Sequence, residues 1–372
     1  MTQSADGFNR PVLEGMLNPE DDARIATVCP GLGVAAQTRK MRNPLWGHIL
    51  ALRTGHAGDR ALRFKASSGG ALSAILIHLL EANIADFVVH TEADPDDPVS
   101  NVTRSSETAE DVANAAGSRY APSSPLADIQ RHLATGCRFA FVGKPCDVAA
   151  LRAMARLDPR IDAQIVCMIS FFCAGVPARH GAMQILKRMG VRLHFLRAFR
   201  YRGHGWPGSA TAILKDGTQR QLNYRESWGD ILSKQVQFRC KICADGTGEA
   251  ADIVCADAWQ GDAKGYPRFE EADGRSLILS RTARGEAIVQ AARRAGVLSA
   301  RHLEESMLER MQPGQASRMR VLFARLAALW ITAQPRPIYR GFALRRAAGR
   351  ASALELVRNF LGTGRRVLMG RR

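Results

Sequence analysis

The sequence predicts an α/β protein in which helices flank a core sheet of parallel or mixed strands. The main observation is a strand–loop–helix unit that occurs twice in succession, with apolar strands at 138–142 and 165–171 and helices at 148–155 and 178–189. Two such units imply parallel neighbouring strands joined by right-handed crossovers. A loop, an apolar helix and a buried strand, together spanning 67–90, come before them in the same α/β order.

The first half of the chain supplies the elements of this core. The first 45 residues are expected to form a short, largely irregular arm that contains Cys29. The loop Ser67-Ser68-Gly69-Gly70 opens the apolar helix at 71–80, and the strand at 84–90 follows it. Asp147 is the expected N-cap of the helix at 148–155, because its side chain can accept from a free backbone N–H of the first turn.

The second half continues with a predicted hairpin, in which strands 197–200 and 210–214 are joined by a glycine-rich turn that contains His204 and Trp206. This turn could contact a substrate or could serve the hairpin alone. A strand at 276–280 and a helix at 285–295 follow. The chain from Arg318 is predicted to be helical, with a break at the prolines of 334–337.

These elements divide the chain into three parts. They are an N-terminal arm over 1–60, a main domain over 61–312 with parts at 61–135 and 136–312, and a basic helical tail over 313–372.

Composition predicts a cytoplasmic protein with reduced thiols. At 372 residues, of which 46% are hydrophobic, the chain is long enough to fill substantial cores. Eight cysteines at irregular spacing are too few for a disulfide scaffold, and the segment before Cys29 has no apolar leader core. No run of 18 apolar residues occurs, so a membrane-spanning helix is not expected.

The formal charge of +17 is concentrated in the tail, where thirteen arginines and one acid, Glu355, follow Gln315. No zinc-finger, helix-turn-helix or aromatic RNA-binding signature accompanies the charge, so no nucleic-acid partner is predicted. The stretch 321–330 sets Leu and Trp beside Arg, which suits an anionic membrane surface or an acidic protein. A helix docked on its own domain, with solvated arginines, is the alternative.

Cys240 and Cys243 have the spacing of half a tetrahedral sulfur site. The pair could be a zinc knuckle, an iron-sulfur ligand pair, a redox dithiol or two incidental surface thiols. Cys146 and Cys173 each stand just beyond a predicted strand end, where α/β proteins place their ligands, so the topology can bring all four thiols together. Scattered loop cysteines suit a 4Fe-4S cluster better than zinc, whose structural sites usually draw a second close pair.

Other candidate residues are weaker. Cys167 and Cys255 lie in apolar strands and are expected to be core residues, and Cys137 precedes a strand. The loop Ser67-Ser68-Gly69-Gly70 before a helix could seat an anion or could simply start the helix. Lys144, after Gly143, could offer a cation to a phosphate or a flavin carbonyl, or could be solvated.

Six motifs in fixed order resemble the coenzyme F420 hydrogenase/dehydrogenase beta-subunit family, over roughly residues 25 to 310. They are Ser-Ser-Gly-Gly-Ala from Ser67, Gly-Ser-Arg-Tyr from Gly117, Gly-Lys-Pro-Cys-Asp from Gly143, Phe-Phe-Cys-Ala-Gly-Val-Pro from Phe171, Arg-Cys-Lys-Ile-Cys-Ala-Asp from Arg239, and the Ala-Asp-Ile and Ala-Asp-Ala-Trp elements from Ala251.

The resemblance implies an iron-sulfur flavoprotein that takes electrons from a ferredoxin-like donor or a partner redox subunit and reduces a small organic acceptor. Carried over by motif, the 4Fe-4S ligands are Cys146, Cys173, Cys240 and Cys243. FAD is expected over Ser67, Ser68, Gly69 and Gly70 and near Gly143 and Lys144. No catalytic residue is assigned.

The chain departs from the family pattern at two places. Of the ferredoxin-like cysteine segments that many relatives carry at the N-terminus, only the turn at Cys29 is present, so the arm resembles a degenerate remnant. Ala256 stands where relatives usually have Gly. The acceptors implied by the family are a deazaflavin, a chlorophyll-type tetrapyrrole or an intermediate of surface-polysaccharide metabolism. The alternatives from other classes are a zinc-stabilised binding module and a basic scaffold for acidic partners.

Overall fold

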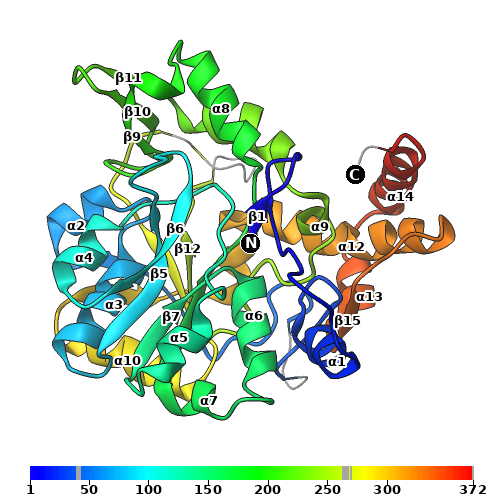
Figure 1. The fold of residues 1–372 in the computed structure, drawn as a ribbon, viewed down its shortest axis with the longest axis horizontal. Coiled ribbons are helices and arrows are strands. Elements are labelled where there is room, and N and C mark those ends of the chain that lie inside the picture. The colour runs from blue at the N-terminus through cyan, green and yellow to red at the C-terminus, as the bar shows by residue number, and fades with distance from the viewer. Residues whose placement is uncertain (39–42, 262–267, 269, 371–372) are drawn as a thin grey trace.

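An eight-stranded mixed sheet forms the centre of the computed structural model, which describes residues 1–38, 43–261, 268 and 270–370 (Figure 1). The strand order is β14-β4-β13-β12-β8-β7-β5-β6. The strands are β4 (Ala51–Ala57), β5 (Phe87–Ala93), β6 (Asn101–Ser106), β7 (Phe139–Val142), β8 (Ile165–Phe171), β12 (Ile253–Asp257), β13 (Ser276–Ser280) and β14 (Leu298–His302). Strands β5, β7, β8 and β12 pair in parallel, and β6, β13, β4 and β14 pair antiparallel to their neighbours. The predicted α/β class and the parallel pairing of the two strand–loop–helix units are confirmed.

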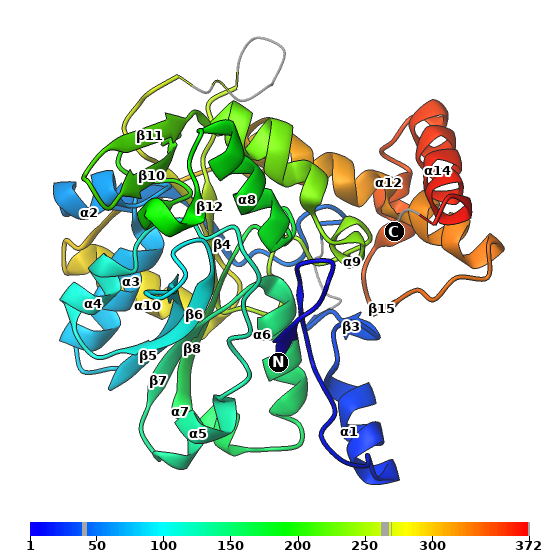
Figure 2. The same cartoon turned by 45° about the horizontal axis from the view of Figure 1, so that its top comes forward.

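Both faces of the sheet are buried. Neighbouring residues of a strand point to opposite faces, so each strand contributes side chains to both cores. Val88 and Ala140 face one core, whereas Val89 and Phe139 face the other. The first core is covered by α3 and α10, and the second by α6, α7 and part of α12 (Figure 2). The flanking helices are α2 (Arg60–Lys65), α3 (Ala71–Glu81), α4 (Ala109–Asn114), α5 (Ile129–Ala134), α6 (Pro145–Met154), α7 (Arg160–Gln164) and α10 (Ala283–Arg294).

The start of α6 differs from the prediction. The helix begins at Pro145 and its N-cap is Lys144, so Asp147 is the third helical residue and not the cap. The Asp147 carboxylate still reaches back and accepts from the Lys144 backbone N–H at 2.9 Å. Proline is favoured in the first helical turn because its missing N–H is not needed there, which explains the earlier start.

A smaller antiparallel sheet lies beyond the carboxyl ends of the parallel strands (Figure 2). It contains the predicted hairpin, β9 (Leu196–Arg200) with β10 (Ala210–Leu214), and adds β11 (Gln219–Leu222). Helical segments pack against it, namely α8 (Arg179–Arg188), the 3-10 turns Leu193–Phe195 and Leu232–Gln235, and the π-helical segment Arg225–Ile231.

The arm is more regular than expected. It holds the short strands β1 (Thr2–Gln3) and β2 (Asn9–Arg10), the helix α1 (Pro19–Val28) and the strand β3 (Gly33–Ala35). Asn18 caps α1 by accepting from the Asp21 backbone N–H at 2.7 Å, and Pro19 opens the helix. Residues 51–57, within the range assigned to the arm, form β4, the second strand from one edge of the main sheet.

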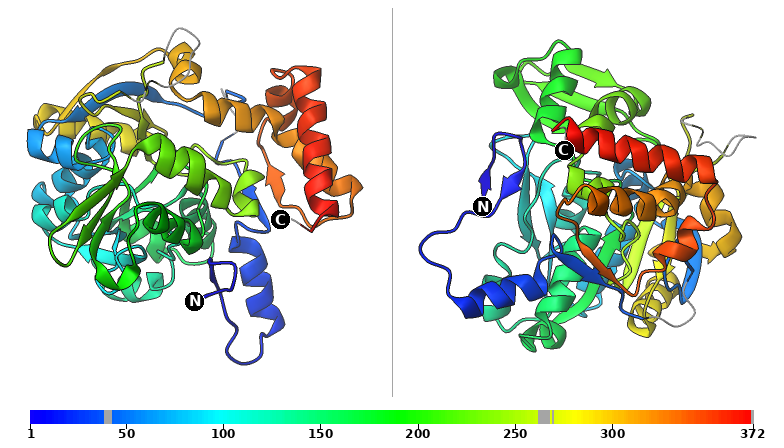
Figure 3. Two further views of the ribbon diagram at one scale, coloured as in Figure 1. Left: turned by 90° about the horizontal axis from the view of Figure 1, so that it is seen from above. Right: turned by 90° about the vertical axis from the view of Figure 1, so that its right-hand side faces the viewer.

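The arm and the tail meet through a parallel pair of strands, β3 with β15 (Ile338–Arg340) (Figure 3). The remaining elements are α9 (Phe238–Lys241), the 3-10 turn Glu305–Met307, α11 (Leu308–Met311), α12 (Pro313–Ile331), α13 (Leu344–Ala348) and α14 (Ala353–Leu368). In the described part of the chain, none of these helices combines the length and apolar character needed to span a bilayer.

Candidate functional site at the carboxyl edge of the sheet

The four predicted ligand cysteines lie on three segments beside the carboxyl ends of β7 and β8. Cys146 is in the first turn of α6, Cys173 follows β8, and Cys240 and Cys243 lie in α9 and just after it. The Cys173 backbone N–H donates to the Gly246 carbonyl at 2.9 Å, and the Val176 N–H donates to Cys240 Sγ at 3.5 Å. These contacts join the loop after β8 to the Cys240–Cys243 segment.

Gly175 permits this close approach. Its φ of +112° is unfavourable for residues with a side chain, and a Cβ there would lie 3.0 Å from the Cβ of Cys240. Both the backbone conformation and the close packing at residue 175 therefore require glycine.

Burial is the main influence on the pKa values of Cys146, Cys173 and Cys243. It raises the pKa of Cys173 to about 12, with a further contribution from the neighbouring Cys240. Burial also raises the pKa of Cys146 and of Cys243, and Arg239 partly offsets the effect at Cys243. All four thiols are half-buried, and the charges of Cys173 and Cys243 contribute to the raised pKa of Cys146. Within the described ranges, no set of three or more His, Cys, Asp and Glu side chains forms a ready site for a single metal ion.

The C-terminal tail holds the cysteine segments in place. The Arg318 guanidinium donates to the carbonyl of Cys173 at 3.0 Å and to that of Cys240 at 2.7 Å, which bridges the two loops. Arg325 donates to the Lys241 carbonyl at 2.9 Å, and the Tyr339 hydroxyl donates to the Ile242 carbonyl at 2.6 Å. The expectation that the tail arginines are solvated or reserved for a surface is therefore wrong for Arg318 and Arg325.

Lys144 lies beside the cysteines. Its ammonium group is 2.7 Å from Asp147 Oδ2 and 2.9 Å from Ser123 Oγ. Burial works to lower the pKa of Lys144, but Asp147 and the nearby Cys146 and Cys173 outweigh it, so the pKa stands above its usual value. Lys144 thus places a buried positive charge next to the thiol group. The preceding Gly143 is tied to β8, where its carbonyl accepts from Ser170 Oγ at 2.9 Å.

The loop Ser67-Ser68-Gly69-Gly70 lies at the same edge of the sheet but is filled by the chain itself. Ser67 Oγ accepts from the Ser118 N–H, and Ser68 Oγ donates to the Ala256 carbonyl at 3.2 Å. Gly69 packs against the backbone of Arg275. Both serine hydroxyls therefore take part in contacts within the fold.

Sequence reasoning did not identify a buried ion pair at the end of β12. Arg202, whose side chain is 1% exposed, forms two hydrogen bonds of 2.9 Å to the two carboxylate oxygens of Asp257. The guanidinium stacks near Tyr224 and Trp259, at 4.7 and 5.2 Å from their ring centroids. Burial works to lower the pKa of Arg202, but Asp257 outweighs it and raises the pKa.

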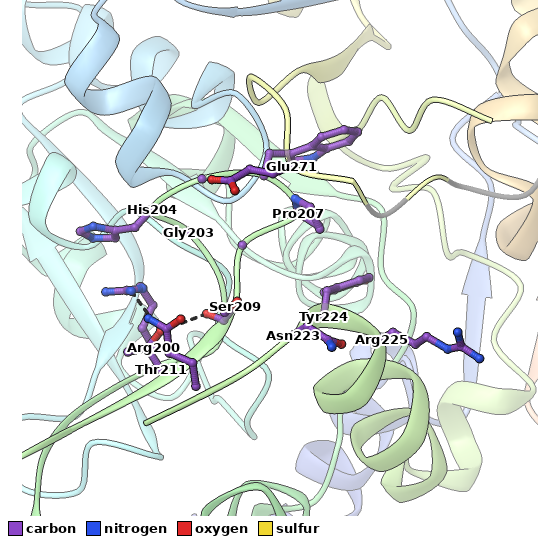
Figure 4. A pocket seen from close by; sticks show the side chains of 14 residues that line it. Arg200, Gly203, His204, Pro207, Ser209, Thr211, Asn223, Tyr224, Arg225 and Glu271 are labelled. Atoms are coloured by element: carbon purple, nitrogen blue, oxygen red, sulfur yellow. Dashed lines mark hydrogen bonds between the residues drawn. The ribbon is translucent and has the colours of Figure 1, made fainter. Parts of the chain in front are cut away.

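A cavity of about 510 Å³ opens next to this ion pair. The glycine-rich turn after β9 forms one side of it, so the predicted turn with His204 and Trp206 both closes the hairpin and lines a cavity. Trp206 stacks on Trp259 at 4.8 Å between centroids and donates its ring N–H to Asp257 at 3.1 Å. Figure 4 shows Arg200, Ser209 and Thr211 on one side of the cavity and Asn223 and Tyr224 across from them.

The other cysteines are placed as follows. Cys167 and Cys255 are buried in β8 and β12, which confirms them as core residues. Cys137 is exposed just before β7, at the opposite edge of the sheet from the four thiols. The turn at Cys29 lies near α9, because Arg239 donates to the carbonyls of Pro30 and Gly31.

Comparison with known proteins identifies relatives of this chain. The family of coenzyme F420 hydrogenase/dehydrogenase beta subunits matches in two parts, its N-terminal part over residues 53–131 and its C-terminal part over 136–306. The coenzyme F420 hydrogenase subunit beta of Methanococcus voltae is 30% identical over 271 residues, which cover 70% of this chain and 87% of that protein.

Two further relatives are more distant. The F420-dependent formate dehydrogenase 1 subunit beta of Methanococcus maripaludis is 24% identical over 68% of this chain and 65% of its own length. The coenzyme F420-dependent sulfite reductase of Methanocaldococcus jannaschii is 24% identical over 71% of this chain, which spans 39% of that protein.

The fold is also found in a solved structure. A chain of the F420-reducing [NiFe] hydrogenase complex from Methanosarcina barkeri superimposes with a TM-score of 0.58 and 20% sequence identity, over 76% of this chain and 96% of that chain. The family models together span the main sheet from β4 to β14 and all four predicted ligand cysteines. This chain therefore belongs to the coenzyme F420 hydrogenase/dehydrogenase beta-subunit family of oxidoreductases.

Proposed function

We propose that this protein is an iron-sulfur oxidoreductase subunit that passes electrons from a ferredoxin-like donor or a partner redox subunit to a small organic acceptor. The observation that supports this most strongly is the placement of four half-buried thiols, Cys146, Cys173, Cys240 and Cys243, on adjoining segments at the carboxyl edge of the sheet. Parallel sheets place their ligands at this edge, so the location fits a functional centre as well as a structural one.

The donor set fits a 4Fe-4S cluster, which four cysteine thiolates hold and which supplies one-electron transfer when bound. Four thiolates in a buried site need compensating positive charge. Lys144, Arg239 and Arg318 supply it, since the first two lie close enough to affect the thiol pKa values and Arg318 bonds to the cysteine loops. The chain's own part in the chemistry is to orient the thiols and to exclude water from them.

We place the acceptor in the cavity beside Trp206, which shares the sheet edge with the thiols. Asp257 ends β12, next to the strand β8 that leads into Cys173, and it bonds to Trp206 on the cavity wall. Arg200, Asn223 and Thr211 offer hydrogen-bond donors that suit a polar, negatively charged acceptor. A deazaflavin is the acceptor that we propose, because coenzyme F420 is named in all three relatives.

FAD is part of this proposal as the two-electron carrier that a hydride acceptor requires. Because the serine hydroxyls of the Ser67–Gly70 loop take part in contacts within the chain, we assign the flavin to the cavity side of that loop. Arg202, which donates to the Ser67 carbonyl at 2.7 Å, connects the two.

The test is anaerobic purification followed by a visible spectrum and counts of iron, sulfide and flavin. We expect about four iron and four sulfide per chain in the wild-type protein. Each of the variants Cys146→Ser, Cys173→Ser, Cys240→Ser and Cys243→Ser should lose most of the iron. The matched controls Cys137→Ser and Cys255→Ala should keep it.

A folded, colourless protein with one zinc per chain would contradict the proposal and support a zinc-stabilised module. Bound iron without flavin and without reduction of deazaflavin by reduced ferredoxin would leave the cluster assignment standing but overturn the proposed acceptor.

A further inference from the structure

The C-terminal helix α14 carries a continuous apolar stripe on its outer side. Leu354, Val357, Leu361 and Leu368 are 77%, 53%, 61% and 82% exposed. Their spacing of three, four and seven residues places them within about 60° of one another around the helix axis, along roughly 21 Å of its length. Isolated exposed leucines are ordinary, but four on one line form a surface.

The opposite side of α14 is already used. Thr363 and Val367 are buried there, and Asn359 accepts two hydrogen bonds from Arg325 of α12, at 3.1 and 2.9 Å. These contacts fix the rotation of α14, so the apolar stripe must face outward. Figures 1 and 3 show α14 at the outer edge of the molecule, with α12 between it and the sheet.

Positive charge borders the stripe. Arg358 and Arg365 are exposed and lie within about 40° of Leu354 around the helix, immediately beside the apolar residues. Of the other exposed tail arginines in the described part of the chain, Arg366 lies on α14 and the rest on neighbouring segments: Arg336, Arg340, Arg345, Arg346 and Arg350. Glu355 is the only acid of the tail, so a single carboxylate stands against thirteen arginines.

We propose that α14 lies flat on an anionic lipid surface, with Leu354, Val357, Leu361 and Leu368 inserted among the acyl chains and the bordering arginines at the phosphate level. An amphipathic helix with apolar residues on one side and arginines at the boundary binds membranes in this way. The arginines are spread over several elements without a common geometry. Such a spread suits mobile lipid headgroups better than the fixed carboxylates of a protein partner. Trp330 and Ile331, each 66% exposed in the last turn of α12, add an aromatic and an aliphatic side chain of the kind found at membrane interfaces.

This inference does not depend on the redox function, so it can be tested on the purified full-length protein alone. The measurement is co-sedimentation with vesicles of phosphatidylcholine, with and without phosphatidylglycerol, at low and high salt. We expect binding to the anionic vesicles only, weakened by salt because the charge contribution is screened.

Two pairs of variants separate the contributions. Leu354→Ser with Leu361→Ser should abolish most of the binding, whereas Leu13→Ser with Leu157→Ser, leucines outside the tail that are also more than half exposed, should leave it unchanged. Arg358→Gln with Arg365→Gln should lower the partition coefficient about tenfold or more, and Arg188→Gln with Arg294→Gln should not. Circular dichroism and thermal unfolding check that every variant is folded.

The proposal is overturned if the wild-type protein binds neither kind of vesicle, which would assign the stripe to a protein partner. It is also overturned if the tail variants bind as tightly as their controls, since general basicity would then explain the binding.

Discussion

Arg202 and Asp257 are the residue pair on which the geometry beside the cavity depends. The guanidinium is fully buried and has two hydrogen bonds to one carboxylate, so its charge is tolerated only because Asp257 is opposite it. The same carboxylate accepts from Trp206, which stacks on Trp259. One side chain therefore fixes the cation, the stacked indoles and the cavity wall.

The variant Asp257→Asn should lower the free energy of unfolding by about 3–5 kcal/mol, because it leaves a buried guanidinium without its counter-charge. Urea unfolding measures the loss. The control is Glu92→Gln, which breaks the more exposed Arg104–Glu92 pair at 2.6 Å and should cost no more than about 1 kcal/mol. Equal losses in the two variants would show that the buried pair has no special role.

The loop before α3 shows how an element depends on backbone conformation. Gly69 and Gly70 both adopt left-handed φ values, +72° and +73°, and this turn delivers the chain into the helix. A Cβ on Gly69 would lie 2.9 Å from the Arg275 Cα, at the start of β13. The two glycines are thus explained by the joint between α3 and the sheet, without reference to a bound anion.

The variant Gly69→Ala should lose both the left-handed conformation and the close packing. We expect it to be at least about 1 kcal/mol less stable than Gly136→Ala, whose φ of +73° is the same but whose Cβ would meet open space. The control should lose only the conformational part, about 1–2 kcal/mol. Thermal or urea unfolding measures the difference in stability between the two variants. A Gly69→Ala protein as stable as the control would mean that the loop can move away from β13.

At the scale of the whole molecule, the tail is a structural part of the main fold. Leu322, Leu326 and Leu329 of α12 belong to the larger of the two sheet cores. Arg318 and Tyr339 bond to the cysteine segments, and β15 pairs with β3 of the arm. Removing the tail would therefore open the core and release the cysteine loops together.

A chain that ends at residue 312 should fail to give a cooperative unfolding transition. A chain that ends at residue 351 keeps α12 and β15 and should unfold cooperatively at a reduced temperature. Calorimetry of the two truncated proteins tests this. If the shorter chain unfolds as cooperatively as the full-length protein, then the tail is an appendage and not a structural part of the fold.

Local patterns in the sequence determined which segments form the main strands and helices and the parallel pairing of β7 with β8, because hydrophobic period, glycine and proline act within a few residues. The N-terminal helix α1 was also within reach, since Asn18 and Pro19 are standard start signals.

Only the tertiary structure decided which distant segments meet. Three contacts join segments whose local sequence does not indicate which segment they will meet. They are the insertion of β4 between β14 and β13, the pairing of Arg202 with Asp257 across 55 positions, and the contacts of Arg318 and Arg325 with the cysteine loops. In sequence, an arginine that bonds to a buried carbonyl looks the same as one in solvent. The tertiary structure distinguishes the two kinds of arginine. The packing of α12 against the sheet turns Arg318 and Arg325 toward the cysteine loops, whereas Arg358 and Arg365 on α14 remain exposed.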